Sequence, residues 1–215
     1  MSMKSDIENA QLYGIVDRGY VGENDIEAVT RELISGGADV IQLRAKECSN
    51  NEILEMARQI ALICREADIP FIVNDFPEIA QQVKSDGLHI GQDDGSLRDV
   101  RKIVGDEMII GRSTHSVAQA EQAMIDGFDY IGFGPLFPTP TKKGRPSIGL
   151  EEISMVQEKV GSQIPVFCIG GITTKNIENV VQAGARRIVI VSDILLAKSI
   201  REATASAKKI ITNFK

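Results

Sequence analysis

The stretch Gly36-Gly37-Ala38-Asp39-Val40-Ile41-Gln42-Leu43-Arg44-Ala45-Lys46 contains a small-residue turn, a short apolar run and three long polar side chains at i, i+2 and i+4. The turn and the run are typical of a buried strand, on which Gln42, Arg44 and Lys46 share one face. Two cations and an amide at the end of such a strand are costly unless an anion lies among them, because unpaired buried charge is strongly disfavoured. A bound phosphate or pyrophosphate is the natural candidate.

Short β-rich runs of the same kind recur along the whole chain. Together with Val40 to Leu43 they are Leu12 to Val16, Phe71 to Val73, Leu88 to Ile90, Met108 to Ile110, Tyr130 to Phe133, Val166 to Ile169 and Ile188 to Val191. Segments with apolar residues at helical spacing lie between them, for example Ala118 to Ile125 and Ile194 to Ile211. Apolar strands that alternate with helices predict a parallel sheet covered on both faces.

A small-residue turn precedes every second predicted strand. The turns are Gly36-Gly37-Ala38-Asp39, Ser85-Asp86-Gly87, Asp126-Gly127-Phe128-Asp129 and Ala183-Gly184-Ala185. Eight strand–helix units with this repeat favour a closed (β/α)8 TIM barrel over an open doubly wound sheet. Residues 1–215 are predicted to form a single domain. The long irregular segment 135–148 is rich in Pro, Thr, Lys and Gly, and loops of this length in compact domains are usually functional.

Composition limits the classes of partner. The formal charge of -6 and the absence of any Lys/Arg block argue against nucleic acid and against anionic membranes. Cys48, Cys64 and Cys168 are odd in number and far apart, which predicts free thiols rather than disulfides or a zinc site. Residues 1–9 are polar and no apolar run approaches the length of a membrane span, so we expect a cytoplasmic protein.

In a TIM barrel the active site lies at the carboxyl ends of the strands, so the polar residues that follow each apolar run are the candidates. In chain order they are Gln42, Arg44 and Lys46; Asn74 and Asp75; Gln92, Asp93 and Asp94; Ser113 and His115; Thr139, Thr141, Lys142 and Lys143; Gly170 and Gly171; and Ser192. Cations, carboxylates and glycines therefore converge on one rim of the predicted barrel.

Two carboxylates at this rim indicate a Mg²⁺ site. Asp75 and one member of the Asp93-Asp94 pair follow adjacent strands, beside an Asn and a Gln. Magnesium is usually held by one or two carboxylates together with waters and substrate phosphates. The alternative is that these residues cap the helices that begin after them, a common role of Asp. The nearby cations Arg44 and Lys142 favour the metal role.

A second anion site is predicted after the seventh and eighth strands. Gly170-Gly171-Ile172-Thr173 and Ser192 occupy the place where many barrels bind a phosphate with backbone N–H groups. A Gly-Gly turn alone is weak evidence, and its position in the seventh unit strengthens it. The rim therefore carries one site suited to a metal-bound pyrophosphate and another suited to a phosphate monoester.

These segments together resemble the thiamine phosphate synthase family, which joins a hydroxymethylpyrimidine pyrophosphate to a thiazole phosphate. The resemblance spans nearly the whole chain and rests on motifs in family order. They are Gln42-Leu43-Arg44-Ala45-Lys46, Asn74-Asp75, Asp86-Gly87-Leu88-His89-Ile90-Gly91-Gln92-Asp93-Asp94, Gly111-Arg112-Ser113-Thr114-His115, Gly134-Pro135-Leu136-Phe137-Pro138-Thr139-Pro140-Thr141-Lys142 and Ile169-Gly170-Gly171-Ile172.

The resemblance implies a role for each candidate residue. The pyrophosphate contacts would be Arg44, Lys46, Asn74 and Lys142. The Mg²⁺ ligands would be Asp75 and Asp94, and the contacts to the aminopyrimidine would be Gln42 and Ser113. The thiazole phosphate would lie against Thr139, Thr141, Gly171, Val191 and Ser192. Among these, the residues closest to the chemistry would be Arg44, Ser113 and Lys142.

The implied reaction yields thiamine monophosphate and pyrophosphate. Magnesium-bound pyrophosphate leaves the methylene carbon of the pyrimidine, and the nitrogen of the thiazole phosphate, or of its carboxy form, captures the resulting cation. No protein nucleophile is needed, and Lys142 on the long loop would help to exclude water. The expected partners are these small molecules, and a homodimer is compatible with the sequence.

The chain departs from the common family pattern at Phe76, where a basic residue is frequent, and at Asp193, where a small residue is usual. Because an acid beside a phosphate site is unfavourable, we interpret Asp193 as an outward-facing cap of the last helix. His89 is interpreted as a hydrogen-bonded structural residue, whereas His115 is open to either a structural or a catalytic role.

Two alternatives remain beside the synthase. A thiazole tautomerase has a similar Arg-Ser-x-His segment, in which the histidine moves a proton, but such proteins generally lack the Asn-Asp and Gln-x-Asp pairs that this chain has. A non-catalytic protein that binds thiazole phosphate or thiamine phosphate is the third hypothesis. Release of pyrophosphate, isomerisation without release, and binding without turnover distinguish the three.

Overall fold

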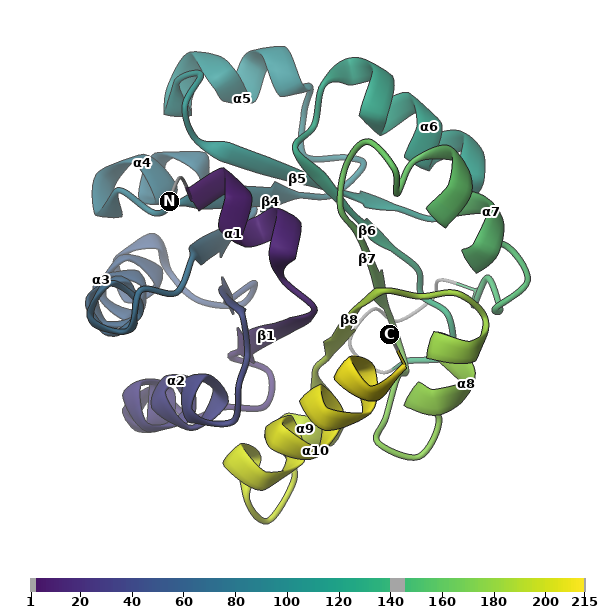
Figure 1. Cartoon of the computed structure of the whole chain (residues 1–215). Coiled ribbons are helices and arrows are strands. Elements are labelled where there is room, and N and C mark those ends of the chain that lie inside the picture. The colour runs from purple at the N-terminus through teal and green to yellow at the C-terminus, as the bar shows by residue number, and fades with distance from the viewer. Residues whose placement is uncertain (1–2, 140–145, 215) are drawn as a thin grey trace.

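The computed structural model describes residues 3–139 and 146–214, and the strands in this part of the chain form one closed parallel barrel (Figure 1). Each strand pairs with the next, and the last pairs with the first. The strands are β1 (Leu12–Asp17), β2 (Val40–Arg44), β3 (Phe71–Asn74), β4 (Gly87–Ile90), β5 (Ile109–Thr114), β6 (Tyr130–Phe133), β7 (Val166–Ile169) and β8 (Arg187–Ile190). The predicted (β/α)8 TIM barrel is confirmed.

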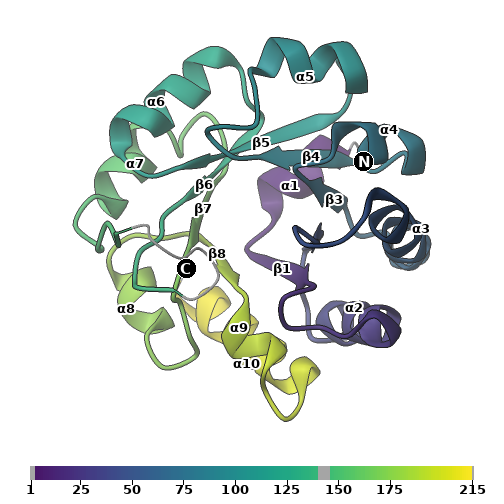
Figure 2. The same cartoon turned by 180° about the vertical axis from the view of Figure 1, so that it is seen from behind.

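The helices surround this ring, except that α1 lies across one of its two mouths (Figures 1 and 2). They are α1 (Met3–Asn9), the 3-10 turn η1 (Glu23–Asp25), α2 (Ile26–Ser35), α3 (Asn50–Ala67), α4 (Pro77–Val83), α5 (Leu97–Val104), α6 (Val117–Asp126), α7 (Ile153–Lys159), α8 (Ile177–Gln182), α9 (Ser192–Leu195) and α10 (Ile200–Asn213). Within the described ranges, we find no helix with the length and apolar character needed to span a bilayer.

Two predicted elements differ from those observed. The fifth strand runs to Thr114 and so includes residues that were expected to follow it, because Gly111 to Thr114 pair with Tyr130 to Phe133 of β6. The predicted helix Ile194 to Ile211 is divided into α9 and α10. Ser199 interrupts it, since its backbone is extended and its side chain accepts a hydrogen bond from the N–H group of Glu202 as the N-cap of α10.

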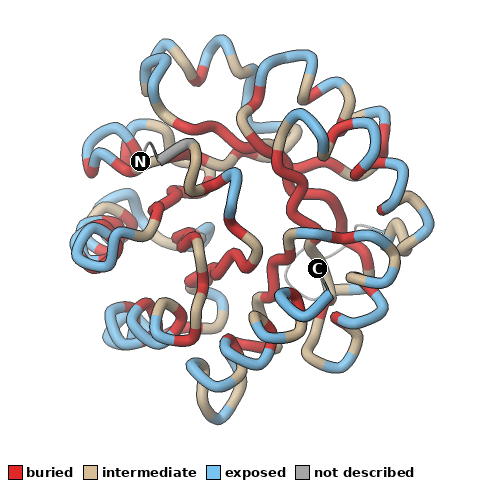
Figure 3. The backbone as a smooth tube through the Cα atoms, in the orientation of Figure 1, coloured by how far each residue is buried: buried red, intermediate tan, exposed pale blue. Residues whose placement is uncertain are grey.

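The barrel separates two apolar cores. The larger core lies between the strands and the helices, and the smaller one fills the interior of the barrel. The interior core comprises Ile7, Ala10, Tyr13, Ile15, Val40, Ile72, Ile109, Tyr130, Phe167 and Val189. Ile7 of α1 belongs to it, so this helix closes the mouth at which the strands begin. Figure 3 shows the buried strands inside and the exposed outer faces of the helices.

The small-residue turns that precede alternate strands place carboxylates at this same end. Asp39, Asp86 and Asp129 each lie directly before a strand and accept a hydrogen bond from the first residues of the preceding strand. The donor N–H groups belong to Leu12, Phe71 and Ile110, at distances of 2.9, 2.8 and 2.9 Å respectively. The turn before β8 has Arg186 in the equivalent position. The internal repeat therefore joins neighbouring strands at the end remote from the predicted site.

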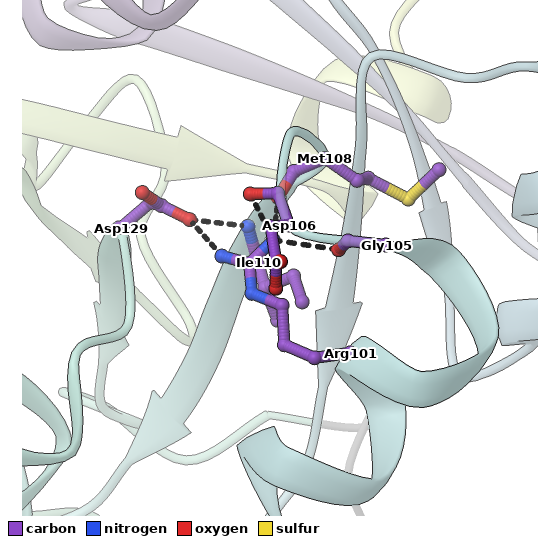
Figure 4. Close-up of polar contacts among 6 residues, drawn as sticks. All are labelled: Arg101, Gly105, Asp106, Met108, Ile110 and Asp129. Carbon is purple, nitrogen blue, oxygen red and sulfur yellow. Dashed lines mark hydrogen bonds and ion pairs between the residues drawn. The ribbon is translucent and has the colours of Figure 1, made fainter.

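We call each of these carboxylate contacts between neighbouring strands a clamp. The clamp formed by Asp129 has the most additional contacts (Figure 4). Arg101 of α5 donates from Nη2 to Oδ2 of Asp129 at 3.0 Å, and both side chains are largely buried. Its other terminal nitrogen donates to the backbone carbonyl groups of Gly105, Asp106 and Met108. One guanidinium group thus holds a helix, the loop after it and the turn before β6 in place.

Candidate active site

A cavity of about 340 Å³ opens at the carboxyl ends of the strands, and every strand contributes at least one residue to its wall. Its lower wall is apolar and aromatic, and its upper wall is polar. It is lined by Tyr13, Ile15, Gln42, Arg44, Lys46, Asn74, Asp75, His89, Gly91, Gln92, Asp93, Asp94, Ser113, Tyr130, Gly132, Phe167, Ile169 and Val189. A flat ring with a charged substituent fits such a division.

A smaller cavity of about 60 Å³ adjoins the first and shares Ser113, Gly132, Ile169 and Val189 with it. Its other lining residues include His115, Thr139, Gly170, Gly171, Val191 and Ser192. The sequence predicted two anion sites on one rim, and the structure brings the residues of each prediction to one of two adjoining cavities. Thr141 and Lys142 lie outside the described residues.

The two cations of the opening motif have anionic partners within the protein. Arg44 Nη1 lies 2.7 Å from Oδ2 of Asp17, and Lys46 Nζ lies 2.9 Å from Oδ2 of Asp75. The anions that the sequence argument required are therefore supplied in part by the protein itself, in addition to the phosphate or pyrophosphate that was named as the natural candidate. Sequence reasoning missed Asp17, which is 1% exposed. The available signal was its position as the first polar residue after the apolar run of β1.

Asp75 and Asp94 lie side by side at the rim. Burial raises the pKa of the Asp75 carboxyl group, and the charge and hydrogen bond of Asp94 add to this rise, whereas Lys46 opposes it. The alternative that these residues cap helices is wrong. The N-cap of α4 is Phe76, which makes no side-chain cap, and the N-cap of α5 is Ser96. Asp94 Oδ2 instead accepts a hydrogen bond from the N–H group of Gly91 at 2.6 Å.

This donor set fits a magnesium ion that arrives with a phosphate ligand. The described residues contain no group of three or more His, Cys, Asp or Glu side chains that could hold a metal by themselves. Two adjacent carboxylates match the usual protein contribution to magnesium, whose remaining ligands are waters and substrate oxygens. Burial is the main cause of the raised pKa of Asp75, and the neighbouring Asp94 carboxylate adds to it, as expected where two carboxylates lie together.

Gln42 and Ser113, on opposite sides of the larger cavity, are connected through its floor. Gln42 Nε2 donates to the Tyr13 hydroxyl at 2.9 Å, and that hydroxyl lies 3.0 Å from the Tyr130 hydroxyl. His89 bridges Tyr130 and Ser113, with its Nδ1 3.2 Å from Tyr130 Oη and its Nε2 3.0 Å from Ser113 Oγ. Sequence reasoning missed both tyrosines because they lie within strands, and only the barrel register reveals that they point inward.

The loops around the smaller cavity depend on left-handed backbone at Gly170 and Gly171, whose φ angles are 101° and 65°. Sequence reasoning interpreted Asp193 as an outward cap of the last helix, and this is wrong. Its Oδ2 accepts a hydrogen bond from the N–H group of Thr174 at 2.8 Å. The carboxylate therefore ties α9 to the loop after β7, the loop that carries the two glycines.

His115 faces the smaller cavity in a defined state. Its Nδ1 is hydrogen-bonded to the carbonyl oxygen of Gly134. Because a carbonyl oxygen only accepts, Nδ1 carries the hydrogen and Nε2 of the neutral ring carries none. The backbone N–H group of His115 donates to Gln119 Oε1 at 2.8 Å, which further fixes the residue.

Comparison with known proteins agrees with this geometry. The profile of the thiamine monophosphate synthase family matches residues 12–194. A thiamine-phosphate synthase of Persephonella marina is 43% identical over 203 residues, which are 94% of this chain and 96% of that protein. A thiamine-phosphate synthase of Halalkalibacterium halodurans is 40% identical over 192 residues, 89% of this chain and 90% of the relative.

A solved structure also resembles the chain over its length. The thiamine phosphate pyrophosphorylase from Pyrococcus furiosus superimposes with a TM-score of 0.87 at 32% sequence identity, and the match covers 99% of this chain and 98% of the other. The match to the family and the sequence identity to the relatives are greater than proteins that share only a fold would show. The chain belongs to the thiamine monophosphate synthase family.

Proposed function

We propose that this chain joins a 4-amino-5-hydroxymethyl-2-methylpyrimidine pyrophosphate to a 4-methyl-5-(2-phosphoethyl)thiazole, or to its carboxy form, as a transferase of the thiamine-phosphate synthase type. The observation that carries the proposal is the pair of adjoining cavities at the rim of the barrel. The larger has a floor built from aromatic side chains and a charged rim, which suits a ring with a pyrophosphate. The smaller has a glycine loop, which suits a phosphate monoester.

The pyrophosphate end of the first substrate would lie against Arg44, Lys46 and Asn74. In the ligand-free chain Arg44 is paired with Asp17 and Lys46 with Asp75. Asp17 is buried and would keep the guanidinium group of Arg44 oriented toward the cavity, whereas the exposed Lys46 can exchange Asp75 for a phosphate oxygen. Lys142 is assigned to the same group of ligands by its place in the family motif.

Asp75 and Asp94 would hold Mg²⁺ together with the pyrophosphate. When bound, this ion would neutralise charge that develops on the leaving group. The protein's own cations act in the same direction, because Arg44 and Lys46 lie where the departing pyrophosphate gains negative charge.

Bond breaking and bond making then need no protein nucleophile. The bond between the methylene carbon and oxygen breaks, and its electron pair leaves with the pyrophosphate. The lone pair of the thiazole nitrogen forms the new carbon–nitrogen bond. The residues shared by the two cavities, among them Ser113 and Gly132, lie where the two rings would meet. Such orientation of two reactants is worth up to roughly 7–11 kcal/mol.

The test is a two-substrate assay with and without magnesium that follows pyrophosphate and thiamine phosphate. Arg44→Ala and Asp94→Ala should each lower kcat/KM by about a hundredfold or more. The free energy of unfolding should change by less than ~1 kcal/mol in Asp94→Ala, but should fall by about 2–3 kcal/mol in Arg44→Ala, because the buried Asp17 loses its cation. Arg58→Ala is the matched control, since Arg58 forms an exposed pair with Glu55 on α3. Activity that falls only in proportion to the unfolded fraction of each variant would make Arg44 and Asp94 structural.

The remaining outcomes identify the alternatives. Isomerisation of the thiazole without release of pyrophosphate would favour a tautomerase, for which His115 in the smaller cavity is the candidate acid–base group. Saturable binding without either reaction would favour a binding protein. The proposal also includes a cytoplasmic location, a single domain over residues 1–215 and a homodimer, the last of which light scattering would test.

A further inference from the structure

We propose that Tyr13 and Tyr130 are positioning residues that lock the Gln42 side chain in one orientation, so that the larger cavity accepts a 4-aminopyrimidine and rejects its 4-oxo counterpart. This inference rests on the proposed function and deepens it. It is carried by the continuous hydrogen-bonded chain from Gln42 through Tyr13, Tyr130 and His89 to Ser113. We call this series of hydrogen bonds the floor relay.

The polarity of the floor relay follows from its first bond. An amide nitrogen only donates, so the Tyr13 hydroxyl accepts from Gln42. The single hydrogen of Tyr13 then goes to Tyr130, which is the other hydroxyl within reach. Tyr130 in turn donates to His89 Nδ1. His89 therefore carries its hydrogen on Nε2 and donates it to Ser113 Oγ.

Burial makes this polarity costly to disturb. Tyr13 is 2% exposed and Tyr130 is 1% exposed. Burial raises the pKa of both phenols far above their usual value, so each keeps its one hydrogen at any ordinary pH. A buried hydroxyl without an acceptor costs about 1–3 kcal/mol. One bond of the floor relay cannot reverse alone, because the next group would then face a second donor or a second acceptor.

The two rings are also held mechanically. The Tyr13 and Tyr130 rings meet the ring of Phe167 edge-on, with centroids 5.2 and 5.7 Å apart respectively. Gly111 provides the space for the Tyr130 ring, since an added Cβ would lie 2.1 Å from its Cζ. The hydroxyl groups are therefore fixed in position by packing that does not involve any ligand.

The fixed direction of these hydrogen bonds determines which groups Gln42 and Ser113 present to a bound pyrimidine ring. With Nε2 engaged by Tyr13, Gln42 offers its amide oxygen to the cavity, and this oxygen accepts a hydrogen bond from an exocyclic amine. Ser113 accepts from His89 through its Oγ atom. A 4-oxo ring would place a carbonyl oxygen against the amide oxygen. To bind it, Gln42 would have to turn, and the whole floor relay, including the His89 tautomer, would have to reverse.

The experiment compares Tyr13→Phe with Tyr20→Phe, an identical change at the chain's third tyrosine, which lies outside the relay. Binding is measured by calorimetry with two unreactive probes, the 4-amino and the 4-oxo pyrimidines joined to a pyrophosphate through a non-cleavable linkage, so that ring reactivity plays no part. The native protein and Tyr20→Phe should prefer the amino probe by about a hundredfold, and Tyr13→Phe by less than about tenfold. Magnesium pyrophosphate alone should bind all three proteins equally.

A second measurement tests the floor relay without any ligand. The chain has two histidines. Nitrogen-15 NMR should show opposite neutral tautomers, with hydrogen on Nδ1 of His115 and on Nε2 of His89, and Tyr130→Phe should convert only the His89 signal to a mixture. His89→Gln identifies the signals.

Three results would overturn the inference: a His89 ring with hydrogen on Nδ1 in the native protein, an unchanged probe preference in Tyr13→Phe, or parallel loss of magnesium pyrophosphate binding in that variant. Failure of the proposed function is separate. In that case the native protein releases no pyrophosphate from the natural substrate pair, while the tautomer measurement still reports on the floor relay.

Discussion

Gly111 is an interior residue of β5, and the ring of Tyr130 occupies the space that a side chain at this position would fill. An added Cβ would lie 2.1 Å from Cζ and 2.5 Å from both Cε atoms of that ring, distances that no Cβ tolerates. Tyr130 cannot move away, because the rings of Tyr13 and Phe167 pack against it. A single glycine therefore permits the aromatic floor of the larger cavity.

Gly111→Ala should lower the free energy of unfolding by about 1–3 kcal/mol, because the added methyl group overpacks a rigid interior. Gly132→Ala is the matched control on the neighbouring strand, since its nearest atom, Cε1 of His89, is 3.5 Å from an added Cβ. Urea unfolding followed by circular dichroism gives both values. An equal effect of the two substitutions would show that the contact with Tyr130 is relieved at little cost.

Residues at strand ends could be predicted, whereas residues within strands could not. Gln42, Asn74 and Asp75 follow apolar runs, and that position alone indicates the rim of a barrel. Tyr13 and Tyr130 occupy apolar runs, where an aromatic side chain is equally consistent with either core. Whether such a side chain faces the barrel interior or the helices depends on strand register, which one sequence does not determine.

The cysteines should differ sharply in reactivity. Burial raises the pKa of Cys64 and Cys168 to about 12, and the two residues are 1% and 0% exposed. At pH 9 iodoacetamide should modify only the partly exposed Cys48 in the folded chain and all three thiols in urea, as counted by mass spectrometry. Rapid native modification of Cys64 or Cys168 would contradict this.

The same shifts predict a loss of stability at high pH. The folded pKa of about 12 lies above the ordinary value of 9.0 for both thiols, so the unfolded chain ionises first. Their contribution to stability is complete below about pH 9 and decreases as the pH rises toward about 12.

At the scale of elements, the short helix α9 and the loop after β7 act as one unit. The link is the hydrogen bond from the Thr174 N–H group to Asp193 Oδ2. Sequence reasoning located the glycines of this loop but separated Asp193 from them, because an acid beside a phosphate site is unfavourable and Asp193 was therefore interpreted as an outward-facing cap. The interruption at Ser199 leaves α9 free to follow the loop rather than the axis of α10.

Asp193→Ala should raise KM for the thiazole phosphate by about tenfold, the equivalent of ~1.4 kcal/mol for one charge-assisted hydrogen bond, with little change in kcat. Asp193→Asn keeps an acceptor for Thr174 and should remain close to the native value. Steady-state kinetics with the pyrimidine substrate at saturation gives the comparison. If Asp193→Ala instead lowers KM, then repulsion between the Asp193 carboxylate and the phosphate outweighs the benefit of its hydrogen bond with Thr174.

Over the whole molecule, stability and function lie at opposite ends of the barrel. The strand beginnings carry α1, which closes the interior with Ile7, and the carboxylate clamps of Asp39, Asp86 and Asp129. The strand ends carry both cavities. The apolar runs predicted the number of strand–helix units, and the repeat of small-residue turns correctly favoured a closed barrel over an open sheet. Its physical origin, a carboxylate that binds the preceding strand, became visible only when strand pairing was known.

This separation predicts that the clamp of Figure 4 affects stability alone. Arg101→Ala leaves the largely buried Asp129 without its cation and should lower the free energy of unfolding by about 2–3 kcal/mol, because the uncompensated charge remains away from water. Arg58→Ala removes an exposed ion pair and should cost at most about 0.5 kcal/mol.

The activity of Arg101→Ala is the second quantity to compare with the native protein. At 25 °C, kcat/KM of Arg101→Ala should stay within about twofold of the native value, because a chain that loses 2–3 kcal/mol from a typical stability of ~5–15 kcal/mol is still almost fully folded. Urea titration and the two-substrate assay on the same preparation give both quantities. A large loss of activity in a fully folded Arg101→Ala protein would mean that the beginnings of β5 and β6 help to position the site at their far ends, and that the two ends of the barrel are coupled.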